Sequence, residues 1–287
     1  MTLPTMVGGT SGPVMREWMR GCDEGPFAAL AVGERIAFDN HEMWTTLAVA
    51  AGVTERIDLI STIVVVPLHD PVDLAKRVAT LDVLSSGRLR LGVGVGGRDE
   101  DYRSVGSPVE RKWDRLDTSI EVMRSVWAGD QQHESIPPVG PRPTGQIELL
   151  SASMGPKSMA RSAVWADGLA GFLFAPDPAS VNQSFDQWNQ AWASAGRTGP
   201  TKLVTSFWYA LGGDGKERLR HYGERYLGFM GDELATALAE SANVSSEAAF
   251  FTALDDLEAA GAEEVILVPT DDDPAELERT LSALARR

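Results

Sequence analysis

Two charged residues, Glu34 and Arg35, follow directly on the apolar run FAALAV. If that run is a strand, both lie at its carboxyl end, where α/β barrels place their chemistry. A carboxylate beside a guanidinium can exchange a proton while the guanidinium holds an anion; a structural ion pair is the alternative. His41, on the next segment, could face a ligand bound there or lie in solvent. Glu34, Arg35 and His41 are therefore the candidate catalytic residues.

Four glycines, Gly92, Gly94, Gly96 and Gly97, fit the dinucleotide pattern G-x-G-x-x-G. That fingerprint belongs to the first strand of a Rossmann fold, whereas about three strand–helix units precede it here. The sequence after it is polar and irregular rather than the start of an apolar helix. A strand whose end lacks side chains, so that a flat ring can approach its backbone, is the better interpretation. Tight packing at a strand end is the alternative.

The tetrapeptide Gly155–Ser158 (Gly-Pro-Lys-Ser) opens a predicted helix immediately after a predicted strand. A proline early in a helix, flanked by small residues, leaves backbone N–H groups free to hold a phosphate. Lys157 or Ser153 could add a direct contact. The pattern is not a P-loop, because Pro156 stands where a lysine would follow the glycine. An ordinary capped helix is the alternative.

Two hydroxyls, of Ser61 and Thr62, interrupt an otherwise apolar strand pattern just before Ile63. They could face a ligand or be satisfied by neighbouring backbone. His69, in the turn PLHDP, has the pattern of a structural capping residue. The four histidines show no metal-ligand spacing, so we expect no metal. Four aromatic residues could line a substrate pocket, although core packing is the alternative for each: Trp44, Trp113, Trp208 and Tyr209.

Short β-branched runs alternate with amphipathic segments along nearly the whole chain, and several runs are continuously apolar, as in strands buried on both faces. The patterns predict eight strands, over 3–7, 27–33, 56–66, 88–95, 146–151, 168–174, 202–211 and 263–269. Helical spacing is clearest over 44–52, 73–87 and 115–129, each closed by a glycine. Eight such repeats predict an α/β fold, a (β/α)8 TIM barrel, as one domain over residues 1–287.

Two segments exceed what a plain barrel needs. Residues 134–146 contain four prolines in thirteen positions, too many for a helix or a central strand. We expect them to form a long excursion at the catalytic rim, a domain boundary being the alternative. Residues 212–260 hold more helix than one crossover requires, which predicts a helical insertion before the last strand.

The composition excludes several classes of protein. The 287 residues carry 26 Lys and Arg against 41 Asp and Glu, a net charge of −15, which repels nucleic acid and anionic lipid. No stretch is long and apolar enough to span a membrane. The opening MTLPTMVGGTSG lacks the pattern of a secretory signal. With Cys22 as the one cysteine, we expect a cytoplasmic protein without disulfides.

Several motifs resemble the bacterial-luciferase-like superfamily, whose members are (β/α)8 barrels that use FMN or the deazaflavin coenzyme F420. They are T-x-R-I-x-L at 54–59, PLHDP at 67–71, L-D-x-L-S-x-G-R-L-x-L-G-V-G-x-G at 81–96, SASMGPKSMARSAVWADGLAGF at 151–172 and ILVPTDDDPAELERTL at 266–281. The resemblance implies a bulge with a non-proline cis peptide at Thr62–Ile63 and a phosphate site near Gly155. Many relatives that use F420 carry Asp-His where this chain has Glu34-Arg35.

The resemblance and the residue patterns together imply a set of cofactor-binding positions. These are Ser61, Thr62, Ile63, Gly94, Val95, Gly96, Gly97, Arg98, Ser153, Gly155, Lys157 and Ser158.

We expect an oxidoreductase in which F420 passes or accepts a hydride. The negative charge disfavours the anionic F420 tail, but Arg35, Arg98 and Arg103 could offset it locally, and the tail would leave the barrel past Arg98 or Arg103 in solvent. One alternative is an FMN-dependent monooxygenase supplied with reduced flavin. Others are a non-catalytic flavin-binding barrel and a phosphate-binding lyase or isomerase. Expected partners are a small-molecule substrate, a flavin or F420 reductase and a second copy of the chain.

Overall fold

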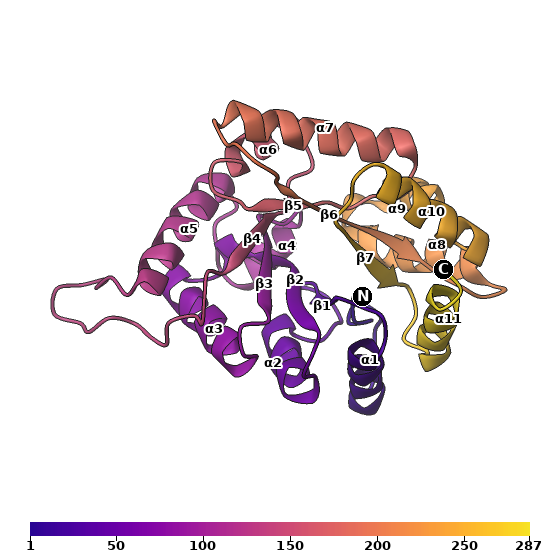
Figure 1. Ribbon diagram of the computed structural model, residues 1–287, viewed down its shortest axis with the longest axis horizontal. Coiled ribbons are helices and arrows are strands. Elements are labelled where there is room, and N and C mark those ends of the chain that lie inside the picture. Colours follow the sequence, from indigo (N-terminus) through magenta and orange to yellow (C-terminus); the bar gives the residue numbers. More distant parts are fainter.

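Seven parallel strands follow one another around a barrel, each hydrogen-bonded to the next in sequence order, and helices surround them (Figure 1). The computed structural model describes residues 1–287. The strands are β1 (Ala29–Val32), β2 (Asp58–Val65), β3 (Leu89–Gly94), β4 (Glu148–Ser151), β5 (Gly168–Ala170), β6 (Lys202–Tyr209) and β7 (Glu264–Pro269). The predicted parallel α/β barrel is therefore confirmed.

The helices connect the strands on the outside of the barrel. They are α1 (Gly12–Glu24), α2 (Met43–Val53), α3 (Pro71–Leu84), α4 (Asp99–Ser104), α5 (Lys112–Ala128), α6 (Pro156–Ser162), α7 (Pro178–Ser194), α8 (Gly215–Leu227), α9 (Asp232–Ser241), α10 (Glu247–Ala259) and α11 (Pro274–Leu284), with 3₁₀ turns η1 (Val66–Leu68) and η2 (Gly228–Met230). The helices expected over 44–52, 73–87 and 115–129 are confirmed as α2, α3 and α5. None of the helices has both the length and the apolar character needed to cross a bilayer.

The strand expected over 3–7 is wrong. Only the first three residues pair with the barrel: Thr2 bridges Ala31, and the Thr2 N–H donates to the carbonyl of Leu267. This segment closes the gap between β1 and β7. Pro4 has no N–H to continue the ladder, and the chain turns away there.

The barrel interior is filled by a small cluster of apolar side chains from alternate positions of several strands. Its buried members are Ala29, Ala31, Ile60, Leu150, Val204 and Ile266. A much larger core of 52 buried residues lies mainly between the strands and the surrounding helices. The interior cluster is thin, so it leaves room for a cavity above it.

The loop with the prolines lies at the opposite end of the barrel from the one expected. Residues 134–146 follow α5 and precede β4, which places them at the amino ends of the strands (Figure 1, at the left). The backbone N–H and the hydroxyl of Thr144 both donate to Asp82, near the end of α3. The expectation of a rim excursion is therefore wrong, because proline content marks a loop without indicating which end of a strand it joins.

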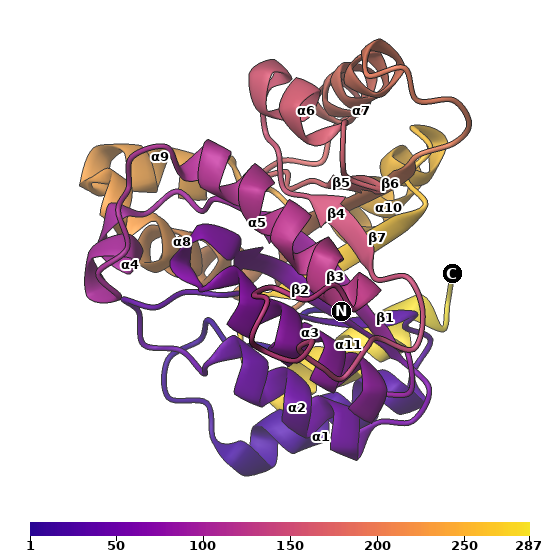
Figure 2. The same cartoon turned by 90° about the vertical axis from the view of Figure 1, so that its left-hand side faces the viewer.

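The helical insertion before the last strand is confirmed. Helices α8 and α9, joined by η2, follow β6 and precede α10. Figure 2 shows α4, α8 and α9 together at one end of the barrel. Because α4 and α8 follow directly on β3 and β6, this is the carboxyl end of the strands, where a barrel places its binding site.

The irregular part of β2 packs closely against the glycines of β3. The β2–β3 register shifts between Ser61 and Val64, and the Thr62–Ile63 peptide is cis. A side chain at Gly92 would collide with the carbonyl oxygen of Ser61, and one at Gly94 would meet Ile63. The tight-packing interpretation of the glycines therefore holds at these two positions. Nothing lies within 4 Å of a Cβ built at Gly97.

Gly92 and Gly97 belong to the same glycine run but differ in their surroundings, so substitutions at the two positions can be compared. We expect Gly92→Ala to lower the free energy of unfolding by about 1–3 kcal/mol, because backbone must move to admit the methyl group. Gly97→Ala is the matched control and should change stability by less than about 0.5 kcal/mol. Urea denaturation followed by circular dichroism measures both; equal stabilities would contradict the close approach of β2 and β3.

Candidate functional site

A cavity of about 570 Å³ occupies the mouth of the barrel. Thirty residues line it, twenty of them hydrophobic, and Arg98 is the only charged one. The size and the mostly apolar lining are those of a site for an organic cofactor or substrate. Its floor includes Ala170, Val204 and Ile266, so it opens directly above the interior cluster.

One wall of the cavity comes from the ends of β2 and β3. Thr62, Ile63, Val95, Gly96 and Gly97 line it. Because Gly96 and Gly97 have no side chain, a flat ring could approach the backbone closely at these two positions. Ser61 and Gly94 support the wall without lining it: Ser61 is buried and its hydroxyl donates to the carbonyl of Gly92.

The start of α6 contributes two of the four residues expected there. Gly155 and Ser158 line the cavity. The Ser158 hydroxyl donates to the Gly155 carbonyl at 2.9 Å and accepts from the Gly155 N–H at 3.3 Å. Lys157 is exposed and does not line the cavity. Ser153 is buried, and its hydroxyl pairs with those of Ser151 and Ser162.

Glu34 lies beside the cavity wall and has both carboxylate oxygens occupied. Oε2 accepts from the Val65 N–H at 2.7 Å, and Oε1 lies 2.9 Å from Nε2 of His69. The side chain is almost fully buried and does not line the cavity. Glu34 thus connects the end of β1 to the end of β2 and to the turn that follows β2. This is a structural role.

Arg35 and His41 do not join Glu34. The Arg35 Nη1 donates to the carbonyl of Tyr226, and its guanidinium lies 3.6 Å from the centre of the Phe38 ring. His41 is exposed, with Nε2 2.8 Å from the carbonyl oxygen of Thr10. The structure therefore does not bring the three candidate catalytic residues together around one ligand.

Arg98 is buried in the cavity wall, with 8% of its surface exposed. Its Nη2 donates to the Tyr226 hydroxyl at 3.0 Å, and Nη1 lies 4.0 Å from Asp101. The expectation that Arg98 offers a contact in solvent is wrong, because the α8–η2 insertion covers it. Arg103, on α4, is exposed.

The second wall is aromatic and was largely missed from the sequence. Of the four aromatic candidates, Trp113 and Trp208 line the cavity, whereas Trp44 and Tyr209 are buried elsewhere in the core. The additional aromatic residues come from the segment after β5 and from the insertion: Phe172, Phe174, Tyr222, Tyr226 and Phe229. Tyr222, Tyr226 and Phe229 have the i, i+4, i+7 spacing of one helix face, and Phe172 and Phe174 alternate as in a strand, but neither pattern distinguishes a cavity lining from core packing.

The aromatic wall is one continuous cluster around Trp208. Ring centres of Phe172 and Tyr226 lie 5.1 and 5.4 Å from that of Trp208. Tyr222 stacks on Tyr226 with an interplanar angle of 9°. Burial raises the pKa of Tyr222 well above its ordinary value, so its hydroxyl stays protonated and can donate a hydrogen bond.

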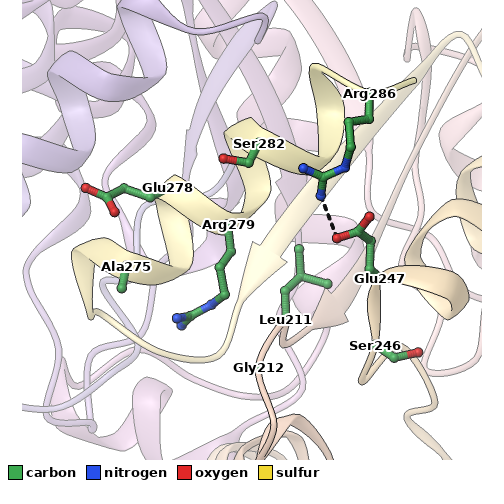
Figure 3. A pocket seen from close by; sticks show the side chains of 9 residues that line it. All are labelled: Leu211, Gly212, Ser246, Glu247, Ala275, Glu278, Arg279, Ser282 and Arg286. Carbon is green, nitrogen blue, oxygen red and sulfur yellow. Dashed lines mark hydrogen bonds and ion pairs between the residues drawn. The ribbon is translucent and has the colours of Figure 1, made fainter.

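A second hollow, of about 500 Å³, lies outside the barrel between α11 and the start of α10 (Figure 3). Only two of its nine lining residues are hydrophobic. Three of its four charged side chains form ion pairs within the protein: Arg286 pairs with Glu247, and Arg279 pairs with Glu276. The barrel mouth is therefore the better candidate for a binding site.

Comparison with known proteins agrees with this architecture. The family model described as luciferase-like monooxygenase matches residues 5–281. This chain belongs to that family. Members of the luciferase-like family are oxidoreductases or monooxygenases.

Curated relatives of this luciferase-like protein match over part of their length. An uncharacterized protein of Mycobacterium tuberculosis strain H37Rv is 29% identical over 167 residues, covering 56% of this chain and 59% of that protein. The 4-hydroxyprotoasukamycin monooxygenase of Streptomyces nodosus subsp. asukaensis is 28% identical over 206 residues, covering 65% and 54%. The chain thus spans between half and three fifths of the length of these relatives.

Solved structures share the fold over nearly the whole chain. The monooxygenase RslO1 from Streptomyces bottropensis superposes with a TM-score of 0.78 at 23% identity, covering 100% of this chain and 97% of that one. An F420-dependent secondary alcohol dehydrogenase has a TM-score of 0.77 at 16% identity, covering 94% and 92%. A type II Baeyer–Villiger monooxygenase of Pseudomonas putida, in complex with FMN, has a TM-score of 0.74 at 14% identity, covering 100% and 96%. The neighbours therefore include proteins that use either cofactor.

The contacts of Glu34 predict how its substitution acts on stability. Glu34→Ala should lower the free energy of unfolding by about 1–3 kcal/mol, because the Val65 N–H and the His69 ring lose their buried partner. Glu34→Gln should cost less, since an amide oxygen can still accept from Val65. Urea denaturation tests both variants, and an unchanged stability of the Ala variant would rule out the structural role of Glu34.

Proposed function

We propose that this luciferase-like protein is a monooxygenase that binds reduced FMN in the barrel mouth and oxygenates an apolar substrate there. The main support for this proposal is the lining of the cavity. Two thirds of the lining residues are hydrophobic, and none has a carboxylate, an imidazole or an ammonium group. Such a site can exclude water and hold two apolar partners together. It offers no general base to take a proton from an alcohol.

The residues of the cavity fit a flavin. The ring would rest against Thr62, Ile63 and the backbone of Gly96 and Gly97, the last two of which have no side chain. The phosphate would lie at the start of α6, where nothing stands within 4 Å of a Cβ built at Gly155. Bound reduced FMN would supply the electrons that activate oxygen.

The chain itself would contribute positioning and a dry environment. The ends of β2 and β3 would fix the ring on one side, and the aromatic cluster around Trp208 would hold the substrate on the other. Tyr222, kept protonated by burial, would donate a hydrogen bond to an oxygen in the cavity. A reductase partner would provide the reduced flavin.

F420-dependent reduction is the second candidate. Arg98 in the cavity wall favours an anionic ligand, and among the structural neighbours is an F420-dependent alcohol dehydrogenase. F420 would supply a hydride, the Tyr222 hydroxyl would donate a hydrogen bond to the substrate oxygen, and the proton would come from water. Oxidation of an alcohol by F420 is less well supported, because no base lines the cavity.

Direct titration distinguishes the two cofactors. We expect the protein to bind FMN more tightly than F420, followed by the change in cofactor fluorescence, and to consume oxygen when given reduced FMN and an apolar substrate. Tighter binding of F420 would favour the second candidate. Binding of FMN without turnover of any reductant would indicate a flavin-binding protein that is not an enzyme.

The phosphate position is tested separately. Gly155→Asp should weaken FMN binding by more than about tenfold, because it adds bulk and like charge at the proposed site. Gly145→Asp is the matched control: it makes the same change in an exposed loop before β4 with open space around it. Equal FMN affinity in the two variants would place the phosphate elsewhere.

A further inference from the structure

Two buried arginines share the aromatic end of the cavity. Arg35 is 6% exposed and Arg98 is 8% exposed. Their guanidinium carbons lie 5.2 and 5.1 Å from the centre of the same ring, that of Tyr226. Phe229 lies within 6 Å of both. The insertion thus packs its aromatic side chains against two cations.

The two cations have too little counter-charge. Asp101 is the one carboxylate within ion-pair distance of Arg98, at 4.0 Å, and its other oxygen accepts from the backbone N–H groups of Ile36 and Ala37. Arg35 forms no ion pair. Burial, reinforced by the charge of Arg98 and partly offset by Asp101 and Glu100, lowers the pKa of Arg35 to about 10, so the Arg35 side chain still carries a positive charge at neutral pH.

Both guanidinium groups also keep unused donors. The Nε atoms of Arg35 and Arg98 are buried and have no hydrogen-bond partner. A buried cation with unsatisfied donors is costly unless an anion completes it. Only Arg98 of the two lines the cavity, so a ligand there would meet its guanidinium first and feel the charge of Arg35 beside it.

We propose that Arg98, supported by the charge of Arg35, binds an anionic oxygen group, such as a carboxylate, on an aromatic substrate. The rings around Trp208 provide the apolar surface for the substrate's body. This inference rests on the proposed function for the place of the cofactor, whose phosphate is assigned to Gly155 and Ser158. Arg98 is then free for the substrate, and it determines specificity for charge.

A matched pair of ligands tests the proposal. We would measure, by calorimetry, the dissociation constants of 2-naphthoate and 2-naphthamide, which differ in charge but hardly in shape. The FMN-loaded protein should bind the carboxylate about tenfold more tightly, as expected for a charge-assisted hydrogen bond in a buried site. Equal affinities, or no binding of either, would overturn the proposal.

Substitutions of Arg98 test whether this residue causes the preference for the carboxylate ligand. Arg98→Met replaces the guanidinium with an apolar side chain, and it should bring the two affinities within about twofold of each other, chiefly by weakening naphthoate binding. Arg98→Lys keeps the charge without the planar fork and should retain part of the preference. Arg103→Met, which removes an exposed arginine of α4, is the control and should behave as the wild type. A full preference remaining in Arg98→Met would overturn the proposal.

The same proteins separate this inference from the proposed function. FMN affinity should be unchanged in Arg98→Met; a loss of FMN binding as large as the loss of naphthoate binding would assign Arg98 to the cofactor and overturn the substrate inference. If FMN does not bind the wild type, the proposed function fails. The preference for naphthoate over naphthamide can then still be measured on the protein without cofactor.

Discussion

The carboxylate of Glu34 holds the part of the barrel on which the cavity depends. It reaches from the end of β1 to the backbone of Val65 and to the ring of His69. These contacts fix the end of β2 just after its irregularity, where Thr62 and Ile63 enter the cavity wall. The shape of β2 in turn requires glycine at 92 in β3. One buried carboxylate thus connects the end of β1 to the end of β2 beside the cavity wall.

Charge in this protein is distributed unevenly between surface and cavity. The chain as a whole has a net charge of −15, but its cavity excludes carboxylates and contains a single guanidinium. Aromatic rings surround that cation, and its one carboxylate partner, Asp101, lies 4.0 Å away. Because rings stabilise a cation only weakly compared with an ion pair, the positive charge remains available to a ligand.

Sequence reasoning was most successful where the site lies on barrel strands. The parallel barrel and the main helices follow from apolar patterns and glycine stops, and Thr62, Ile63, Gly96 and Gly97, which form part of the cavity wall, are among the predicted cofactor-binding positions. The aromatic wall was not predicted, because the i, i+4, i+7 spacing of Tyr222, Tyr226 and Phe229 indicates one helix face but does not distinguish a cavity lining from ordinary core packing. Residues 134–146 were assigned to the wrong end of the barrel, since composition identifies a loop but carries no direction. Local sequence could not show that Arg35 turns away from its neighbour Glu34.

The two walls of the cavity have separate origins in the chain. The ring-facing wall comes from strand ends that the whole barrel constrains, whereas Tyr222, Tyr226, Phe229 and Met230 come from one contiguous insertion after β6. Sequence change in that insertion can therefore reshape the cavity without disturbing strand pairing. Related barrels could therefore differ in the ligands they bind through changes in this one segment. A combinatorial library restricted to residues 215–241 would sample new ligand preferences on an unchanged scaffold.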